Sequence, residues 1–216
     1  MIVTQPDRLL LRKQVKAFAH ELIGTILDVG SADGKRYGNL FSHATEHLTL
    51  DISAECHPDI MGSAEDIPLD DTSVDSVLCT QVLEHVPHPQ KAISEMFRVL
   101  KSGGKAFITV PQWNELHEEP HDYFRYTCFG LKTMCEDAGF SVLKIDQRGK
   151  YHACRAQMKI RYWIDRLKPY ERKWAMLIMA PLSTLCTKYA LFRDNMNRST
   201  ASTKHAIGWA VLLQKS

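Results

Sequence analysis

The sequence lacks several features that would define its class at once. Its 216 residues contain no apolar run near the ~20 residues that a membrane-spanning helix needs. Its six cysteines form no C-x-x-C pair and no framework spacing, which favours reduced thiols in a cytosolic protein. The apolar run Leu9–Leu11 is too short for a secretory signal peptide, so we expect none. Without repeats or low-complexity tracts, the chain suits one domain with a substantial core.

The G-x-G-x-x-G pattern of a dinucleotide fold is also missing. Residues 26–34 instead read Ile-Leu-Asp-Val-Gly-Ser-Ala-Asp-Gly, a short apolar run followed by a glycine loop. A strand ending at Val29 would lead into a turn where Gly30 and Gly34 let the backbone pass close to a ligand. The carboxylate of Asp28 would repel a pyrophosphate but suits a ligand with an ammonium and a sulfonium group. This pattern favours S-adenosylmethionine over NAD.

A second acid ends the next apolar run. Asp51 follows Leu-Thr-Leu at 48–50 and is placed to accept hydrogen bonds from two ribose hydroxyls. NAD sites use the same device, so Asp51 alone does not separate the two cofactors. The glycine spacing and Asp28 make that distinction.

Further motifs follow in order: Ala-Glu-Asp-Ile-Pro-Leu at 64–69, Val-Leu-Glu-His-Val at 82–86, and Arg-Val-Leu-Lys-Ser-Gly-Gly at 98–104. With these, the stretch from about 26 to 149 resembles the class I S-adenosylmethionine-dependent methyltransferases, in particular the type 11 group. The family pattern Asp-x-Gly-x-Gly-x-Gly is matched except that Ala32 replaces the middle glycine. Each motif is weak alone, whereas five in order are a strong signal.

The resemblance implies a set of cofactor contacts. The side chain at position 63 and the backbone at 64 would meet the adenine edge, although many relatives carry Asp where this chain has Ser63. Residues just after the fourth strand would face the methionine end. The predicted cofactor-binding residues are Asp28, Gly30, Ser31, Ala32, Gly34, Asp51, Ile52, Ser63, Ala64, Glu65 and Gln81.

The acceptor side is less well defined. The Asn/Asp-Pro-Pro-aromatic motif of DNA and exocyclic-amine methyltransferases is absent, because residues 79–82 read Cys-Thr-Gln-Val. Three histidines, His85, His117 and His121, are candidate general bases, with a packed histidine as the alternative reading of His85. Tyr123 and Arg125 are candidates to hold an anionic or hydroxylated acceptor.

Residues 117–121 formally match the zinc-protease motif H-E-x-x-H. That motif requires a helix with both histidines on one face. Pro120 would remove a helical N–H and clash with the preceding turn, and the segment follows Val110-Pro111, where a loop is expected. The sequence therefore predicts a substrate-facing loop and no metal ligands.

Alternating apolar patterns predict a Rossmann-like, doubly wound α/β fold. Its seven-stranded sheet would be mostly parallel, with a helical insertion before the last strand. The resemblance to the type 11 methyltransferases implies that this last strand is antiparallel. We expect one methyltransferase domain over 1–216, with an N-terminal helix in 1–24, a cofactor core at 25–149, a basic insertion at 151–204 and the last strand in 205–216. The expected strands are 25–29, 47–51, 59–61, 74–79, 105–110, 140–145 and 207–213, and the expected helices include 7–22, 89–100 and 131–138.

Charge is strongly segregated. Residues 1–149 hold 14 Lys/Arg and 22 Asp/Glu, a net −8, whereas residues 150–216 hold 13 and 3, a net +10. The uncharged run 174–187, interrupted by Pro181, is too short to span a bilayer. The insertion reads either as a core or lid helix, or as a basic segment at 155–192 that makes peripheral membrane contact or grips a lipid-linked anionic substrate. Packing of the basic segment on the acidic body is the plainer alternative.

Together these patterns predict S-adenosylmethionine-dependent methyl transfer to a small or lipid-linked, hydroxylated or anionic acceptor such as a cell-envelope glycan, by a cytoplasmic or membrane-associated enzyme. One alternative is an RNA methyltransferase that uses the basic segment. It is disfavoured because Trp163 and Trp174 read as helix-core residues rather than a base-stacking platform. The other is a protein that binds the cofactor without turnover. The acceptor and the oligomeric state stay open.

Overall fold

The structure, a computed structural model, describes residues 2–32 and 37–216. The predicted site residue Gly34 lies outside the described residues. The chain forms two compact units. The sheet unit comprises residues 15–111, 116–146 and 209–216, and the hairpin unit comprises the N-terminal residues up to 14 together with 112–115 and 147–208.

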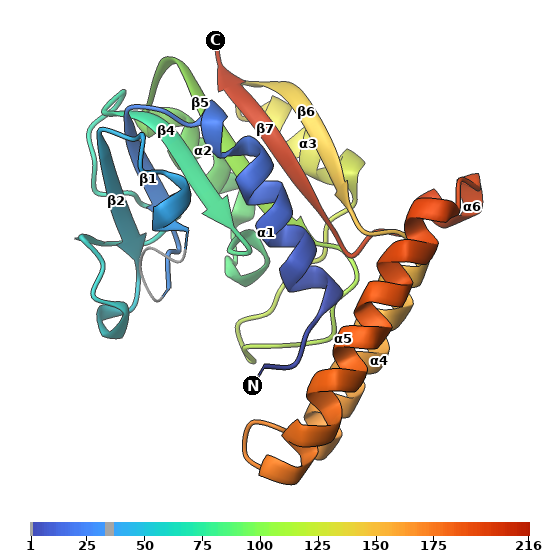
Figure 1. Cartoon of the computed structure of the whole chain (residues 1–216). Helices are drawn as coiled ribbons and strands as arrows, with labels where there is room; N and C mark the ends of the chain where they lie inside the picture. The colour runs from blue at the N-terminus through green and yellow to red at the C-terminus, as the bar shows by residue number, and fades with distance from the viewer. Residues whose placement is uncertain (1, 33–36) are drawn as a thin grey trace. The chain divides into compact units, whose positions relative to one another are not determined.

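A seven-stranded sheet in the order β3-β2-β1-β4-β5-β7-β6 organises the fold. Strand β1 pairs in parallel with β2 and with β4, and β4 pairs in parallel with β5. Strand β7 runs antiparallel, which confirms the predicted fold class (Figure 1). The strands are β1 Thr25–Val29, β2 Glu46–Asp51, β3 Ile60–Met61, β4 Val74–Thr80, β5 Leu100–Pro111, β6 Phe140–Arg148 and β7 Gly208–Lys215.

The helices fit the sheet because each has an apolar stripe. In α2 (Pro89–Val99), the buried side chains include Ala92, Ile93 and Met96, at the spacing of one helix face. At the end of α1 (Pro6–Phe18), Phe18 stacks on Phe107 of β5 with 4.9 Å between ring centroids. The third helix is α3 (Cys128–Asp137), and short 3-10 turns lie at η1 Ala19–Glu21, η2 Gly38–Leu40, η3 Ala54–Cys56 and η4 Leu83–His85.

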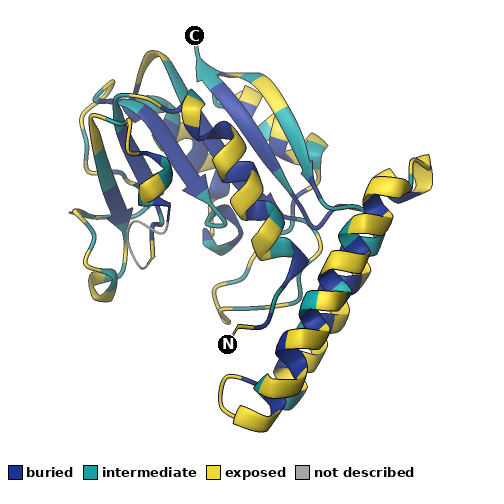
Figure 2. Cartoon of the chain, in the orientation of Figure 1, coloured by how far each residue is buried: buried dark blue, intermediate teal, exposed yellow. Residues whose placement is uncertain are grey.

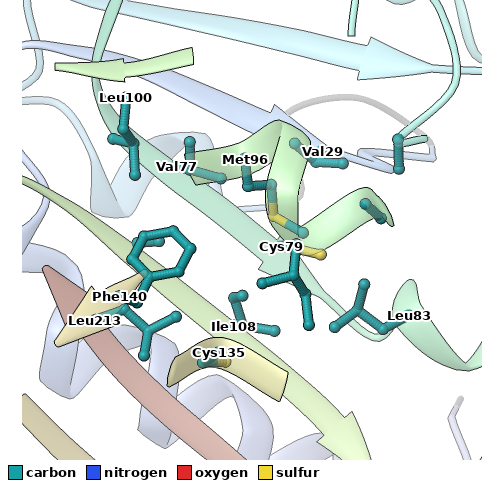
Figure 3. Close-up of a cluster of buried hydrophobic side chains, with 14 of the residues drawn as sticks. Val29, Val77, Cys79, Leu83, Met96, Leu100, Ile108, Cys135, Phe140 and Leu213 are labelled. Carbon is teal, nitrogen blue, oxygen red and sulfur yellow. The ribbon is translucent and has the colours of Figure 1, made fainter. Parts of the chain in front are cut away.

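The main core lies between the central strands and helices α2 and α3 (Figure 3). Leu83 of the turn η4, which follows β4, is fully buried in this core and holds the turn against it. Burial raises the pKa of the Cys79 thiol well above its ordinary value and that of Cys135 to about 12. These two cysteines are therefore unreactive core residues, as the reduced-thiol prediction requires.

The predicted strand at 105–110 begins earlier than expected. Strand β5 starts at Leu100, because a register shift between Val74 and Ser76 lets Leu100 pair with Val74 before Lys105 pairs with Ser76. Gly103, at φ +78°, lies in this irregular stretch. Glycine permits that backbone geometry, which the alternating apolar pattern does not reveal.

Two long helices make up most of the hairpin unit. Helix α4 (Tyr151–Leu167) and helix α5 (Lys173–Met196) lie side by side, followed by the short α6 (Thr200–Thr203) (Figure 1). Their contact buries Ile160, Ile164 and Met179 against Val3. At the opposite end, the Asp194 carboxylate accepts the backbone N–H groups of residues 150, 152 and 153 and so caps the start of α4.

Two sequence expectations about this hairpin were wrong. Pro181 does not interrupt α5, because the buried face of that helix packs along α4 and outweighs the lost hydrogen bond. The helix is consequently 24 residues long. By length and composition alone it could cross a membrane, as could many core helices of soluble proteins. Trp163 and Trp174, expected in the helix core, are 46% and 54% exposed. Other residues of α4 and α5 form the buried stripes, which face each other between the two helices (Figure 2).

Candidate active site

The glycine loop after β1 makes a tight turn beside β2. The backbone N–H groups of Gly30 and Ser31 donate to the Leu50 carbonyl at 2.8 and 3.3 Å. Gly30 has φ +67°, and a Cβ there would lie 2.4 Å from a methyl carbon of Val82. Ala32 also adopts a left-handed conformation, at φ 50°, which explains why the family pattern has glycine at this position.

Asp51 links this loop to the end of β2. Its Oδ2 accepts the Ala32 N–H and its Oδ1 accepts the Ser53 N–H, both at 2.9 Å. A carboxylate has further lone pairs after two such bonds, so Asp51 can still accept from ligand hydroxyls. The next residue, Ile52, is 76% exposed. Asp51 is thus held rigidly at the carboxyl edge of the sheet, as its predicted role requires.

Asp28 lies inside the sheet rather than at its open edge. Its side chain is 5% exposed, and Oδ2 is 3.4 Å from Nε2 of His47 on β2. The cofactor-binding role of Asp28 stays a prediction.

The segment predicted to border the adenine forms a turn that is held by hydrogen bonds within it and to the start of α2. The Ser63 hydroxyl accepts the Glu65 N–H at 3.1 Å, and Ser63 pairs with Asp66 in an isolated antiparallel bridge. Ala64 is buried, and Oε1 of Glu65 accepts the His88 N–H at 3.1 Å. Glu65 therefore ties this turn to the start of α2.

Gln81 occupies the corresponding edge after β4. It has φ 58°, its N–H donates to the Thr109 carbonyl at 3.0 Å, and its amide donates to the Thr109 hydroxyl at 3.3 Å. Left-handed non-glycine residues are uncommon and cluster at functional sites. The predicted residues from β1, β2 and β4 thus lie at the carboxyl ends of adjacent parallel strands, where α/β sheets bind ligands.

Two of the three candidate bases, His85 and His117, bring their rings together beside this edge, and His121 contacts His85 through its backbone carbonyl. His85 Nδ1 donates to the His121 carbonyl at 2.7 Å, and the His85 and His117 rings meet edge to face with centroids 4.9 Å apart. His121 Nδ1 is 3.1 Å from the hydroxyl of Tyr123, which is 44% exposed. As predicted, residues 117–121 form a loop rather than a helix.

An ion pair that the sequence analysis missed supports this loop. The side chain of Asp122 is 1% exposed and receives Arg125 Nη1 at 2.6 Å and Nη2 at 2.7 Å. These bonds and the His117 N–H hold the pKa of the Asp122 carboxyl at about 2. The guanidinium of Arg125, predicted to hold the acceptor, is therefore engaged with Asp122.

The loop is also clamped to η4 through backbone atoms. The N–H groups of Tyr123 and Phe124 donate to the Glu84 carbonyl at 2.8 and 3.3 Å. The buried hydroxyl of Tyr126 donates to the Leu83 carbonyl at 2.7 Å, and burial raises the pKa of this tyrosine. Glu84, whose side chain is fully buried, was also absent from the predicted site, although it directly precedes His85 in the family motif.

Comparison with known proteins agrees with this geometry. Residues 27–108 match the family described as "Methyltransferase domain". An uncharacterised methyltransferase of Mycobacterium tuberculosis is 35% identical over 103 residues, which cover 43% of this chain and 41% of that relative. The chain thus spans about two fifths of the length of this relative and of two similar mycobacterial relatives. Residues 27–108 are therefore similar to class I methyltransferases of the type 11 group.

Solved structures extend the likeness in fold to nearly the whole chain. The crystal structure of the [4+2]-cyclase SpnF has a TM-score of 0.64 at 20% identity, covering 97% of this chain and 81% of that one. A SAM-dependent methyltransferase from Archaeoglobus fulgidus has a TM-score of 0.62 at 14% identity, covering 96% and 94%. At these identities the likeness shows the fold alone. The cyclase illustrates that this fold does not fix the chemistry.

The Asp122–Arg125 ion pair leads us to predict how the stability of this protein depends on acid pH. Because the folded-state pKa of Asp122 is lowered to about 2, its contribution is complete above its ordinary pKa of ~3.9 and is lost as the pH falls toward 2. We expect Asp122→Asn to lower the free energy of unfolding by about 2 kcal/mol at pH 7, with the difference shrinking below about pH 4. Urea unfolding from pH 7 to 2.5 measures this. A difference that is constant across that range would contradict the assignment.

Proposed function

We propose that this protein transfers a methyl group from S-adenosylmethionine to a hydroxylated or anionic acceptor that is small or lipid-linked. The observation that carries the proposal is the placement of Asp51 and the glycine loop at the same sheet edge as Gln81 and the histidine cluster. A cofactor bound at the first pair would direct its reactive end toward the second.

The residues present fit this cofactor. Gly30 lets the loop pack closely against Val82, Asp51 would accept the ribose hydroxyls, and the turn at Ser63 would border the adenine. Gln81 would lie at the methionine end. When bound, the cofactor supplies a methyl group on a sulfonium, which is a good leaving group, so the protein mainly has to align a nucleophile and exclude water.

The histidines supply the proton chemistry in this proposal. The Nδ1 proton of His85 is committed to the His121 carbonyl, which leaves Nε2 as the basic atom. A hydroxyl held there would give up its proton to Nε2 as its oxygen approaches the methyl carbon. His117 and His121 lie close enough to orient the acceptor or to take over this role, and Tyr123 offers an exposed hydroxyl beside them.

Cofactor binding through Asp51 is the first prediction. Asp51→Ala removes the proposed ribose acceptor, so the affinity for S-adenosylmethionine should fall by at least tenfold in calorimetric titration. Glu55→Ala, at an exposed acid four residues further on, is the matched control and should bind like wild type. NAD should not bind.

Equal affinity of the Asp51 and Glu55 variants would remove Asp51 from the site. Absence of S-adenosylmethionine binding by folded wild type would favour the alternative of a different ligand. Binding without turnover on any hydroxylated acceptor would favour the non-enzymatic alternative.

The exposed face of α5 supports a place for the acceptor at a membrane. Eight large apolar side chains are 51–68% exposed, at helical spacing along one face. Basic residues Arg172, Lys173, Lys188 and Arg193 flank or interleave this face. Apolar and aromatic side chains bordered by cations are typical of interfacial helices on anionic lipid. The apolar residues are Trp174, Leu177, Ile178, Leu182, Leu185, Tyr189, Phe192 and Met196.

We therefore propose peripheral membrane contact through this face and predict co-sedimentation with vesicles. Wild type should sediment with vesicles that contain phosphatidylglycerol, and less at high salt. The double variant Leu182→Glu/Leu185→Glu should stay in the supernatant, because it places two carboxylates on the apolar face. Leu143→Glu, at an exposed leucine of β6, is the control and should sediment like wild type.

Equal sedimentation of the double variant would contradict the membrane proposal. Binding to RNA that weakens steeply with salt, without vesicle binding, would favour the RNA methyltransferase instead. Against that alternative, the exposed aromatics of α5 are spread along one helix face among leucines rather than grouped on a strand platform.

A further inference from the structure

We infer that Glu84, His85 and His117 form a binding site for a first-row divalent transition-metal ion. One candidate ligand atom from each residue lies within 4.8 Å of the other two. The residues come from two segments, the turn η4 and the loop at 117–126, which are joined by the backbone bonds to the Glu84 carbonyl. The cluster is therefore held together by contacts other than those of its own side chains.

Both histidines have a polar group beside the Nδ1 atom. His85 Nδ1 donates to the His121 carbonyl at 2.7 Å. His117 Nδ1 faces the Asp122–Arg125 pair, 3.4 Å from the carboxylate and 3.5 Å from the guanidinium. Metal-binding histidines typically have such a carbonyl or carboxylate on the second nitrogen, which fixes the ring orientation.

Electrostatics point the same way. The Glu84 side chain is 0% exposed, so a divalent cation held by this cluster would lie beside a buried carboxylate. The exposed Glu118 brings Oε2 to 3.7 Å from His85 Nε2 and can supply a further ligand from the open side. Ligand atoms about 2.1 Å from one tetrahedral ion lie ~3.4 Å apart, so the three groups need to converge by about 1.5 Å at most.

The ligand set selects the ion. Two imidazoles and a carboxylate suit Zn²⁺, Co²⁺, Mn²⁺ or Fe²⁺, whereas Mg²⁺ prefers oxygen ligands alone. Three protein ligands leave positions open for oxygen atoms of another molecule. Of the three residues Glu84, His85 and His117, only His117 comes from the H-E-x-x-H segment. The loop turns the His121 ring toward Tyr123 and brings His117 to residues 84 and 85 instead.

The consequence for catalysis rests on the proposed function. With the ion bound, His85 would serve as a ligand and not as the general base. A hydroxyl oxygen of the acceptor bound to the ion would then lose its proton more readily, to water or to a histidine outside the ligand set. That oxygen would then form the bond to the methyl carbon while the carbon–sulfur bond breaks and its electron pair stays on sulfur. The site would thus select acceptors with a hydroxyl near a second oxygen ligand.

Metal binding can be tested without any acceptor. Untagged full-length protein, stripped with a chelator, is titrated with Zn²⁺, Co²⁺, Mn²⁺ and Mg²⁺ in a calorimeter, and bound metal is counted after dialysis. We expect one transition-metal ion per chain and at least tenfold weaker Mg²⁺ binding. His117→Ala and Glu84→Gln should weaken Zn²⁺ binding by at least tenfold. His88→Ala, at an exposed histidine three residues from His85, should bind like wild type.

Thermal unfolding of each variant separates loss of a ligand from loss of the fold, and His117→Ala keeps the test valid if Glu84→Gln does not fold. Equal Zn²⁺ affinity of wild type and folded His117→Ala, or no binding by wild type, would overturn the inference. Parallel titration with S-adenosylmethionine distinguishes the two proposals. Cofactor binding without metal refutes the metal site alone, whereas metal binding without cofactor supports the site and contradicts the proposed function.

Discussion

The candidate site depends on how the turn after β4 is fixed. Leu83 is buried in the main core, and its carbonyl accepts the hydroxyl of Tyr126. The neighbouring carbonyl of Glu84 accepts two backbone N–H groups from the loop at 117–126. Because these bonds join segments about 40 residues apart, they bring His117 and His121 to His85. Without this clamp, the loop would have no fixed register against the sheet edge.

The arrangement separates rigid from adjustable parts. Asp51, the glycine loop and Gln81 are fixed by backbone hydrogen bonds at the carboxyl ends of β1, β2 and β4. The loop at 117–126 brings charged and aromatic side chains to this edge. It is held by hydrogen bonds to the carbonyls of residues 83 and 84 and by its internal Asp122–Arg125 ion pair. Loops are where relatives on one fold acquire different chemistry. In the proposed function, the sheet edge would therefore bind the cofactor, and this loop would contact the acceptor.

Much of the fold could be predicted from the sequence, because period-2 and period-3.6 apolar patterns act locally. The strand at 25–29 and the helix that starts at Pro89 match the structure closely. The early start of β5 and the continuous α5 were missed. The first depends on a glycine-containing register shift, and the second on packing along α4 that outweighs Pro181.

The site was only partly predictable. Each histidine is recognisable in the sequence as a candidate base. Their proximity depends on backbone hydrogen bonds between two distant segments, which no local pattern shows. Arg125 looked available for an acceptor because its partner Asp122 is recognisable only from the geometry of the loop. Glu84 was overlooked because an acid beside a histidine motif ordinarily faces solvent, whereas here it is buried. Long-range contacts and burial thus account for what was missed.

The central claim is that the carboxyl edge of β1, β2 and β4 binds S-adenosylmethionine with its sulfur toward the histidine cluster. A crystal structure of the protein with the product S-adenosylhomocysteine tests this most directly. The account predicts ribose hydroxyls on the Asp51 carboxylate, adenine beside Ser63 and Ala64, and the sulfur facing the segment from Gln81 to His85. Product bound elsewhere, or with its sulfur turned away from His85 and His117, would contradict it.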